Sequence, residues 1–282
     1  MTDEEYCYLT RKIRKLTGIE LNNYKNRQMR RRLEHLLLSS NFADVISYCS
    51  LLENDPTMVE KLKDFLTINV SEFFRDPKYF HLLMTDILPE MLKQRTRLTI
   101  WSAGCSNGAE PYSVAMILDQ LSPFSHHRIL ATDIDQKCLE KAKHGGPYYP
   151  NEVRNVPAHF FGKYLVETED GYKVTEKIRQ SVIFKQHDLL QDPVDEKFDL
   201  ILCRNVLIYL TEQAKYSTYQ KLHHALRENG ILFVGAAEII LNPAAVGFEI
   251  YSPLFYRKLT ASQVCLATVK TAALLSTRKS LI

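Results

Sequence analysis

A glycine-containing segment and an aspartate farther along the chain have the types and spacing expected of a nucleoside-binding site. In WSAGCSNGAEP (residues 101–111), Gly104 and Gly108 allow the backbone to turn tightly and to approach a ligand, and Pro111 suits the first turn of a helix. Asp133 ends the next apolar run, in ATDID, where a carboxylate can accept hydrogen bonds from both ribose hydroxyls. Together these features favour an adenosine-containing cofactor.

The glycine-containing turn also narrows the choice of cofactor. The chain lacks both the GxGxxG pattern of dinucleotide-binding domains and the GxxxxGK[ST] pattern of phosphate-binding loops. The turn carries no lysine that could balance a polyphosphate, and S-adenosylmethionine, which has no phosphate, fits better. Polar side chains follow two more apolar runs, as a pocket over the edge of a sheet requires: Asp188 beside Leu189 in QHDLL, and Arg204, Asn205 and Tyr209 in LCRNVLIY.

These residues need a sheet to bring them together, and the sequence from about Leu98 onward predicts one. Short apolar runs (LTIWSA, HRILATD, SVIFKQ, FDLILC and ILFVGAA) alternate with helical patterns, the last of which, TEQAKYSTYQKLHHALRENG, should end at Gly230. Strands alternating with helices predict a mainly parallel α/β sheet of Rossmann-like type. The final FEIYSPLFYRKL suits a closing hairpin with an antiparallel last strand.

One insertion interrupts this alternation, at about residues 147–181. YLVET and YKVTEKI flank Glu169, Asp170 and Gly171, which is a strong hairpin signal. We therefore expect a small antiparallel β-subdomain inside the α/β domain.

The first part of the chain is expected to be all helical and basic. RQMRRRLEHLLL places Met29, Leu33, Leu36 and Leu37 on one stripe, and two further amphipathic helices have start signals at Ser40-Asn41 and Asp55-Pro56. Nine lysines or arginines and one acid lie between positions 11 and 32. Two interpretations stay open: a solvated helix face, or a surface that binds an acidic partner. The expected domains are residues 1–68 (helical), 69–97 (linker and first helix), 98–260 (α/β) and 261–282 (a tail).

Composition excludes several classes. The 282 residues are 45% hydrophobic and 24% charged, as in ordinary globular proteins, and no apolar run approaches the ~20 residues of a membrane span. The N-terminus is acidic and polar rather than basic and then apolar, so we expect no signal peptide and a cytoplasmic location. Six cysteines and nine histidines show no metal-ligand spacing, so we expect neither a metal site nor a disulfide framework.

The motifs in their order carry a family resemblance. INVSEFFRDP, IWSAGCSNGAEPYS, ATDID, FDLILCRNVLIY and LFVGAAE, behind a basic helical domain, resemble the CheR-type chemoreceptor glutamate methyltransferases over about residues 5–259. The resemblance implies a class I methyltransferase fold, S-adenosylmethionine as donor with S-adenosylhomocysteine as product, and the γ-carboxylate of receptor glutamates as acceptor. Asn107 and Ala109 depart from the family, many of whose members have Thr and a second Glu there.

The resemblance also implies roles for individual residues. The implied cofactor contacts, to which our own analysis adds Gly104, are Asn69, Ser71, Arg75, Glu110, Asp133, Asp188, Leu189, Arg204 and Asn205. Arg75 and Tyr209 should lie closest to the transferred methyl group. The alternatives are that Arg75 pairs with Glu72 or Asp76, that Tyr209 is a core aromatic, and that Glu110 is a helix N-terminal carboxylate.

The expected partner is the acidic, helical cytoplasmic region of a chemoreceptor. It would lie beside the cluster formed by Arg27, Arg30, Arg31 and Arg32. The short hairpin loop at residues 169–171 is similar to the family branch that does not depend on a receptor tether peptide. We expect a monomer that binds no nucleic acid and inserts into no membrane. The rival hypotheses are an RNA methyltransferase and a non-catalytic module that binds the cofactor and signals.

Overall fold

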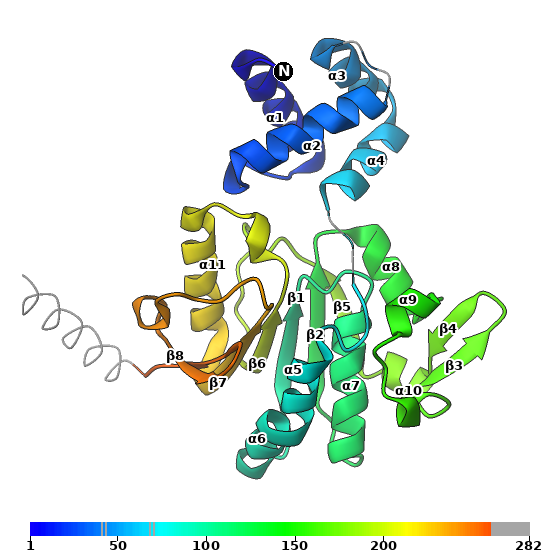
Figure 1. The fold of residues 1–282 in the computed structure, drawn as a ribbon, viewed down its shortest axis with the longest axis vertical. Helices are drawn as coiled ribbons and strands as arrows, with labels where there is room; N and C mark the ends of the chain where they lie inside the picture. Colours follow the sequence, from blue (N-terminus) through cyan, green and yellow to red (C-terminus); the bar gives the residue numbers. More distant parts are fainter. Residues whose placement is uncertain (41, 43, 68, 70, 261–282) are drawn as a thin grey trace, which may run out of the picture. The chain divides into compact units, whose positions relative to one another are not determined.

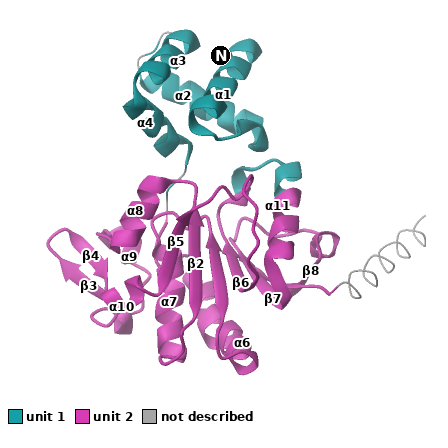
Figure 2. Cartoon of the chain, turned by 180° about the vertical axis from the view of Figure 1, so that it is seen from behind, with its two compact units in different colours: residues 1–69, 208–215 teal, residues 70–207, 216–282 magenta. Residues whose placement is uncertain are grey.

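The computed structural model describes residues 1–40, 42, 44–67, 69 and 71–260; the expected tail at 261–282 lies outside the described residues. The chain forms two compact units, residues 1–69 with 208–215 and residues 70–207 with 216–282, which are described separately below (Figure 2). None of the helices in the described ranges has the length and apolar character needed to cross a membrane.

The first unit is helical over its described residues, as the sequence predicts, and includes α1 (Asp3–Thr17), which was not among the three helices expected. It also contains α2 (Asn26–Ser39), α3 (Val45–Asn54) and α4 (Pro56–Leu66), with a short 3₁₀ helix (Leu21–Asn23) before α2 (Figure 1). Asp55 accepts a hydrogen bond from the Thr57 N–H and caps α4, so that start signal is confirmed. The start expected at Ser40-Asn41 is wrong: α3 begins at Val45, because Asp44 caps it.

The segment of residues 208–215, which follows the strand β6 (Phe198–Cys203), also belongs to the first unit. The Lys25 N–H donates to the Tyr209 carbonyl oxygen (2.9 Å), the Lys25 ammonium donates to the Ile208 carbonyl oxygen (2.9 Å), and the Thr211 N–H donates to the Asn23 carbonyl oxygen (2.8 Å). These hydrogen bonds tie residues 208–211 to the residues just before α2, about 180 positions earlier in the chain. Sequence patterns, which are local, did not predict this pairing.

The second unit is a seven-stranded sheet with helices packed against it. A helical stretch of α5 (Pro77–Leu82), a π-helical turn (Leu83–Ile87) and α6 (Leu88–Gln94) leads into the sheet. The strand order is β5-β2-β1-β6-β7-β9-β8, and the first five strands are parallel, as predicted. The strands of this sheet are β1 Thr99–Ala103, β2 Arg128–Asp133, β5 Val182–Gln186, β6 Phe198–Cys203, β7 Leu226–Val234, β8 Phe248–Ser252 and β9 Phe255–Lys258.

The connections fix where a ligand can bind. The helix α7 (Ala109–Leu121) connects β1 to β2, α8 (Gln136–His144) follows β2, and α11 (Glu212–Ala225) lies between β6 and β7. The chain moves from β1 to β2 and β5 on one side and then returns to β6 on the other side of β1. The strand order therefore reverses between β1 and β6, and in open α/β sheets ligands bind beyond the carboxyl ends of the strands at such a point.

The hairpins agree with the sequence, and one helix end does not. β9 is antiparallel to both β7 and β8, as expected for the closing hairpin, and β3 (Leu165–Thr168) pairs antiparallel with β4 (Gly171–Val174) in the insertion. The short helices α9 (Pro150–Val153) and α10 (Glu176–Arg179) flank this hairpin. The helix expected to reach Gly230 ends at Ala225, because the buried Leu226 already pairs with Phe198 as part of β7.

Candidate active site

The loop after β1 has the tight conformation that its glycines suggested. Gly104 (φ 80°) and Gly108 (φ 85°) are both left-handed, and the N–H groups of Gly104 and Cys105 both donate to the Thr132 carbonyl oxygen. A Cβ added to Gly104 would lie 2.5 Å from Cγ2 of Val206, which follows β6. Glycine is therefore required where the loops after β1 and β6 approach each other.

Asp133 stands at the end of β2, as predicted, and holds this loop. One carboxylate oxygen accepts a hydrogen bond from the Ser106 N–H (2.7 Å) and the other accepts one from the Asp135 N–H (2.9 Å). Removal from water raises the pKa of Asp133, and the hydrogen bonds from backbone N–H groups oppose this rise. Because each oxygen keeps a second lone pair, the carboxylate can still accept hydroxyl donors.

Glu110 and Arg204 form a buried ion pair across the reversal point of the sheet. Glu110 accepts hydrogen bonds from the Ser102 hydroxyl (2.8 Å) and from the Arg204 guanidinium (3.3 Å), and the Arg204 side chain is only 1% exposed. Burial raises the pKa of Glu110, while the charge of Arg204 lowers it. The Glu110 carboxylate therefore joins the end of β1 to the end of β6 and is not only a helix N-terminal carboxylate.

Arg204 also holds the segment that carries Arg75. Its guanidinium donates to the Arg75 carbonyl oxygen (2.9 Å) and to the Asp76 carboxylate (2.7 Å), and it lies over the rings of Phe80 and Phe233. The position of the Arg75 backbone is thus set by a side chain from the end of β6.

Residues 71–76 are held in a costly conformation, which bears on the alternatives considered for Arg75. Phe74 (φ 51°) and Asp76 (φ 60°) are left-handed, a conformation that costs about 1–3 kcal/mol for residues other than glycine and that clusters at functional sites. Asp76 pairs with Arg204, and Glu72 pairs with Arg154 (2.8 Å). Both acids proposed as alternative partners of Arg75 therefore have other cations.

The two phenylalanines of FFR anchor the same segment. Phe73 is fully buried with its ring edge-on to Tyr148 (4.8 Å between centroids), and its N–H donates to the carbonyl oxygen of Glu152. The Phe74 N–H donates to the Ser113 hydroxyl (3.0 Å). Ser71 opens this segment and is half-buried.

Asp188 and Leu189 lie in the loop after β5, at the same edge of the sheet as Asp133. The His187 N–H donates to the Asp133 carbonyl oxygen (3.0 Å), which places the loop next to β2. Asp188 accepts from the N–H of Leu190 (2.8 Å), and Lys221 of α11 donates to the Leu189 carbonyl oxygen (2.6 Å). The loop is thereby fixed from both sides.

Asn205 is left-handed (φ 61°), and its conformation depends on a residue that sequence reasoning missed. The carboxylate of Glu238, 5% exposed, accepts hydrogen bonds from the N–H groups of Asn205 (2.5 Å), Leu207 (2.6 Å) and Gly235 (2.9 Å). A signal was present, because Glu238 ends LFVGAAE and is a polar side chain following a strand.

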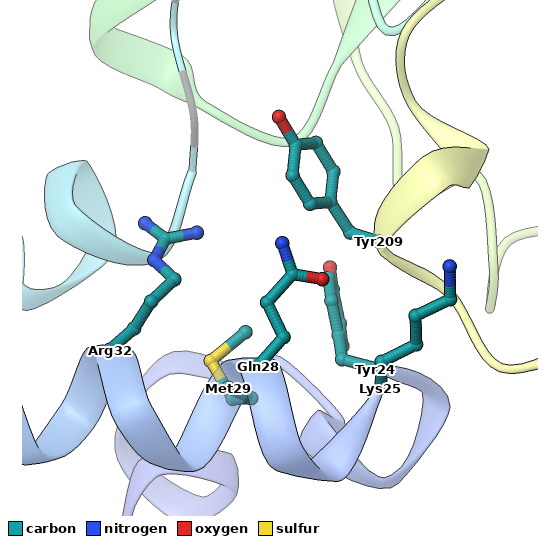
Figure 3. A pocket seen from close by; sticks show the side chains of 6 residues that line it. All are labelled: Tyr24, Lys25, Gln28, Met29, Arg32 and Tyr209. Atoms are coloured by element: carbon teal, nitrogen blue, oxygen red, sulfur yellow. The ribbon is translucent and has the colours of Figure 1, made fainter. Parts of the chain in front are cut away.

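Two of the expected site residues, Asn69 and Tyr209, belong to the first unit. The Asn69 amide donates to the Thr67 hydroxyl (3.1 Å). Tyr209 lines a small hollow together with Tyr24, Lys25, Gln28, Met29 and Arg32, and Figure 3 shows Gln28 and Arg32 extending from α2 toward the side on which Tyr209 lies. Lys25 and Arg32 are the cationic residues among those that line the hollow.

The four arginines of α2 divide into two kinds. Arg30 pairs with Asp3 (2.5 Å) and lies over the ring of Tyr6, and Arg32 donates to the Phe65 carbonyl oxygen. Arg27 and Arg31 are exposed, four positions apart on one helix face, and have no ion pair within the described ranges. Among the arginines of α2, Arg27 and Arg31 are the exposed ones that lack an ion pair to a described residue.

The residues at the sheet edge fit S-adenosylmethionine better than a phosphate-bearing cofactor. The Ser106 hydroxyl and the Asn205 amide oxygen are buried and have no hydrogen-bond partner among the residues that the structure describes. The nearby Asp133 carboxylate would repel a phosphate, and the guanidinium of Arg204 is already held by carboxylates. Uncharged donors and acceptors beside a carboxylate suit a ribose and an adenine.

Comparison with known proteins identifies the family of this chain. Residues 4–67 match the family described as "CheR methyltransferase, all-alpha domain", and residues 69–250 match "CheR methyltransferase, SAM binding domain". The chemotaxis protein methyltransferase of Listeria monocytogenes is 37% identical over 257 residues, covering 91% of this chain and 98% of that protein. The chemotaxis protein methyltransferase of Borreliella burgdorferi is 32% identical over 275 residues, covering 92% and 95%. Because both domains match in order and the relatives span nearly the whole chain, this protein belongs to the CheR family of S-adenosylmethionine-dependent methyltransferases.

Proposed function

We propose that the protein transfers a methyl group from S-adenosylmethionine to the γ-carboxylate of glutamate residues in chemoreceptors, forming methyl esters. The observation that carries this proposal is the match to both CheR domains over residues 4–67 and 69–250, together with relatives named chemotaxis protein methyltransferase.

The chemistry requires no general base. The ordinary pKa of glutamate is about 4.3, so the acceptor is already ionised at neutral pH. S-adenosylmethionine supplies a methyl group on a positively charged sulfur. As the carboxylate oxygen forms its bond to the methyl carbon, the carbon–sulfur bond breaks, and the neutral thioether of S-adenosylhomocysteine leaves without a proton transfer. The protein must bring the reactants together, align them and remove water from the carboxylate.

The proposed roles of Arg75 and Tyr209 follow from this requirement. Arg75 steers the carboxylate without neutralising it tightly, because a tight ion pair would weaken its attack. Tyr209 orients the carboxylate by a hydrogen bond from its hydroxyl. The contacts of Arg204 with the Arg75 carbonyl oxygen and with Asp76 support a fixed position for the Arg75 backbone.

The proposed cofactor contacts are those that the family resemblance implied, together with Gly104 from the sequence analysis. Gly104, Glu110, Asp133, Arg204 and Asn205 gather at the reversal point of the sheet, Asp188 and Leu189 follow the neighbouring strand, and Ser71 and Arg75 lie in the segment held by Arg204. Asn69 is the remaining member of the proposed set. In this arrangement Glu110 and Arg204 act chiefly by shaping the pocket, because their charged groups already pair with each other.

We further propose that α2 binds the helical cytoplasmic region of the receptor. Arg27 and Arg31 are the arginines of the original cluster whose charges are free for an acidic partner, whereas Arg30 and Arg32 contribute to packing. The protein would act as a monomer in the cytoplasm, where that region of a receptor lies.

One assay tests the acceptor and separates the rival functions. The protein is incubated with radiolabelled S-adenosylmethionine, receptor-containing membranes and, separately, RNA. We expect label on the receptor that is released by base, because a methyl ester hydrolyses readily. Label on RNA would support the rival methyltransferase, and binding of the donor without any transfer would support a non-catalytic module.

The receptor surface has its own test. Arg27→Glu should reduce receptor methylation, and Lys185→Glu, at an exposed position on β5, serves as the control with the same change of charge. The wild-type rate should fall with salt, since the screening length shortens from about 10 Å at 0.1 M to about 3 Å at 1 M. A rate independent of ionic strength would contradict the electrostatic contact.

A further inference from the structure

We propose that Glu238 is a positioning residue for cofactor binding, which fixes the loop after β6 in its binding conformation. The inference rests on the proposed function, because it concerns the same pocket. Glu238 itself is not among the residues that the family resemblance placed at the site.

The first argument is the hydrogen bonding of the Glu238 carboxylate. One oxygen accepts from the N–H groups of Asn205 (2.5 Å) and Gly235 (2.9 Å), and the other accepts from the Leu207 N–H (2.6 Å). Two of these donors follow β6 and the third follows β7. A single side chain therefore joins the ends of two neighbouring parallel strands.

The second argument is that this carboxylate is buried without a cation. Glu238 is 5% exposed, and no ion pair to it occurs among the described residues. A buried carboxylate is costly unless it is paired or hydrogen-bonded, so the three N–H groups must stabilise its charge. Gly235 makes this approach possible, since an added Cβ would lie 2.7 Å from the nearer Glu238 oxygen and 2.9 Å from the Asn205 nitrogen.

The third argument is what the fixed loop carries. Asn205 is held in the left-handed conformation, and its buried amide oxygen has no hydrogen-bond partner in the described part of the chain, so it can accept a donor from a ligand. The next residue, Val206, packs against Gly104 of the loop after β1. Glu238 thus sets the distance between the two loops that border the reversal point, where the cofactor is expected to bind.

The test is Glu238→Gln, which keeps the shape and removes the charge. Whichever way the amide is oriented, at least one of the three N–H groups then faces an NH₂ donor and loses its acceptor. We expect the Kd for S-adenosylhomocysteine, measured by calorimetry, to rise about tenfold or more. The KM for S-adenosylmethionine should rise with it, while the KM for the receptor stays unchanged. Glu228→Gln, at an exposed position on β7, is the matched control.

Each outcome decides the inference. A raised Kd in Glu238→Gln with an unchanged Kd in Glu228→Gln supports it. An unchanged Kd overturns it, even where thermal stability falls, because the residue would then be purely structural. If the wild type fails to bind S-adenosylhomocysteine, the proposed function fails as well, whereas binding by both wild type and variant overturns this inference alone.

A measurement on the wild type keeps the proposal testable if the variant does not fold. The amides of Asn205, Leu207 and Gly235 should exchange their hydrogens more slowly when S-adenosylhomocysteine is present, since the ligand stabilises the loop that they anchor. Exchange rates at these three amides that do not respond to the ligand would overturn the proposal.

Discussion

Replacing Arg204 by methionine should destabilise the second unit in a strongly pH-dependent way. The methionine side chain can occupy the space between the rings of Phe80 and Phe233, so packing is largely preserved. What is lost is the cation beside two carboxylates. Asp76 is 35% exposed and can be hydrated, whereas Glu110 is 11% exposed and keeps only its hydrogen bond from Ser102.

The magnitude follows from how Glu110 can respond. Breaking a buried ion pair from one side typically costs about 3–5 kcal/mol. The cost cannot exceed that of neutralising Glu110, about 1.4 kcal/mol for each pH unit above the ordinary glutamate pKa of about 4.3. That limit is about 5 kcal/mol at about pH 8 and about 1 kcal/mol at about pH 5. With a urea dependence of about 3 kcal/mol per molar, the unfolding midpoint should fall by about 1–2 M at the higher pH and by less than about 0.5 M at the lower pH.

The direction of this pH dependence can be checked from the pKa of Glu110. Burial raises that pKa and Arg204 opposes the rise, so the substitution raises it further. A group whose pKa is higher in the folded state than in the unfolded state favours folding when protonated, and that contribution is lost as the pH rises through the folded-state pKa. The deficit of the variant relative to wild type must therefore grow with pH.

The chain is well suited to this measurement because Trp101, its one tryptophan, is buried in β1. Its fluorescence reports on unfolding of the second unit without interference from the first. Arg128→Met is the matched control, because Arg128 makes two hydrogen bonds to Glu196 but both side chains are nearly half exposed, so its loss should cost at most about 1 kcal/mol. Equal shifts for the two variants, or a deficit that does not change with pH, would refute the reasoning.

Three further changes have defined outcomes. Gly104→Ala should weaken S-adenosylhomocysteine binding about tenfold, because a Cβ strains the left-handed backbone and meets Val206 at 2.5 Å. Adding Val206→Ala should recover part of the lost affinity. An unchanged Kd in Gly104→Ala would contradict the requirement for glycine. Lys221→Met should raise the same Kd several-fold, because the Lys221 ammonium anchors the Leu189 carbonyl oxygen. Equal Kd values for the variant and the wild type would mean that the loop after β5 keeps its conformation without this hydrogen bond. Arg75→Ala should lower kcat/KM for receptor methylation about a hundredfold or more, and near-normal turnover would reject its proposed role.

Much of the fold could be predicted because its signals are local. A strand buried on both faces appears as a short apolar run wherever it pairs, and the hairpin at residues 169–171 is specified by its own turn residues. The carboxyl ends of parallel strands meet at one edge, so Asp133 and Arg204 could be assigned to the same edge of the sheet from the sequence. The end of α11 was missed because pairing of Leu226 with Phe198 overrode a helical pattern.

The parts that could not be predicted depend on contacts between distant positions. Glu110 and Arg204 are 94 positions apart, and only the pairing of β1 with β6 makes them neighbours. Glu238 lies 33 positions after Asn205, and its carboxylate reaches the Asn205 N–H only because β7 runs beside β6. The division of the α2 arginines was equally hidden, since Asp3 and Phe65, which engage Arg30 and Arg32, come from other helices.

The sequence by itself determined the class of fold, the order of its elements and which residues follow the strands, because backbone periodicity, turn chemistry and strand ends are properties of short segments. The tertiary structure decided which of those residues hold one another and which keep a free polar atom for a ligand. The physical reason is that buried charges must find partners, and those partners are chosen by strand order and packing, which bring together parts of the chain that no local pattern connects.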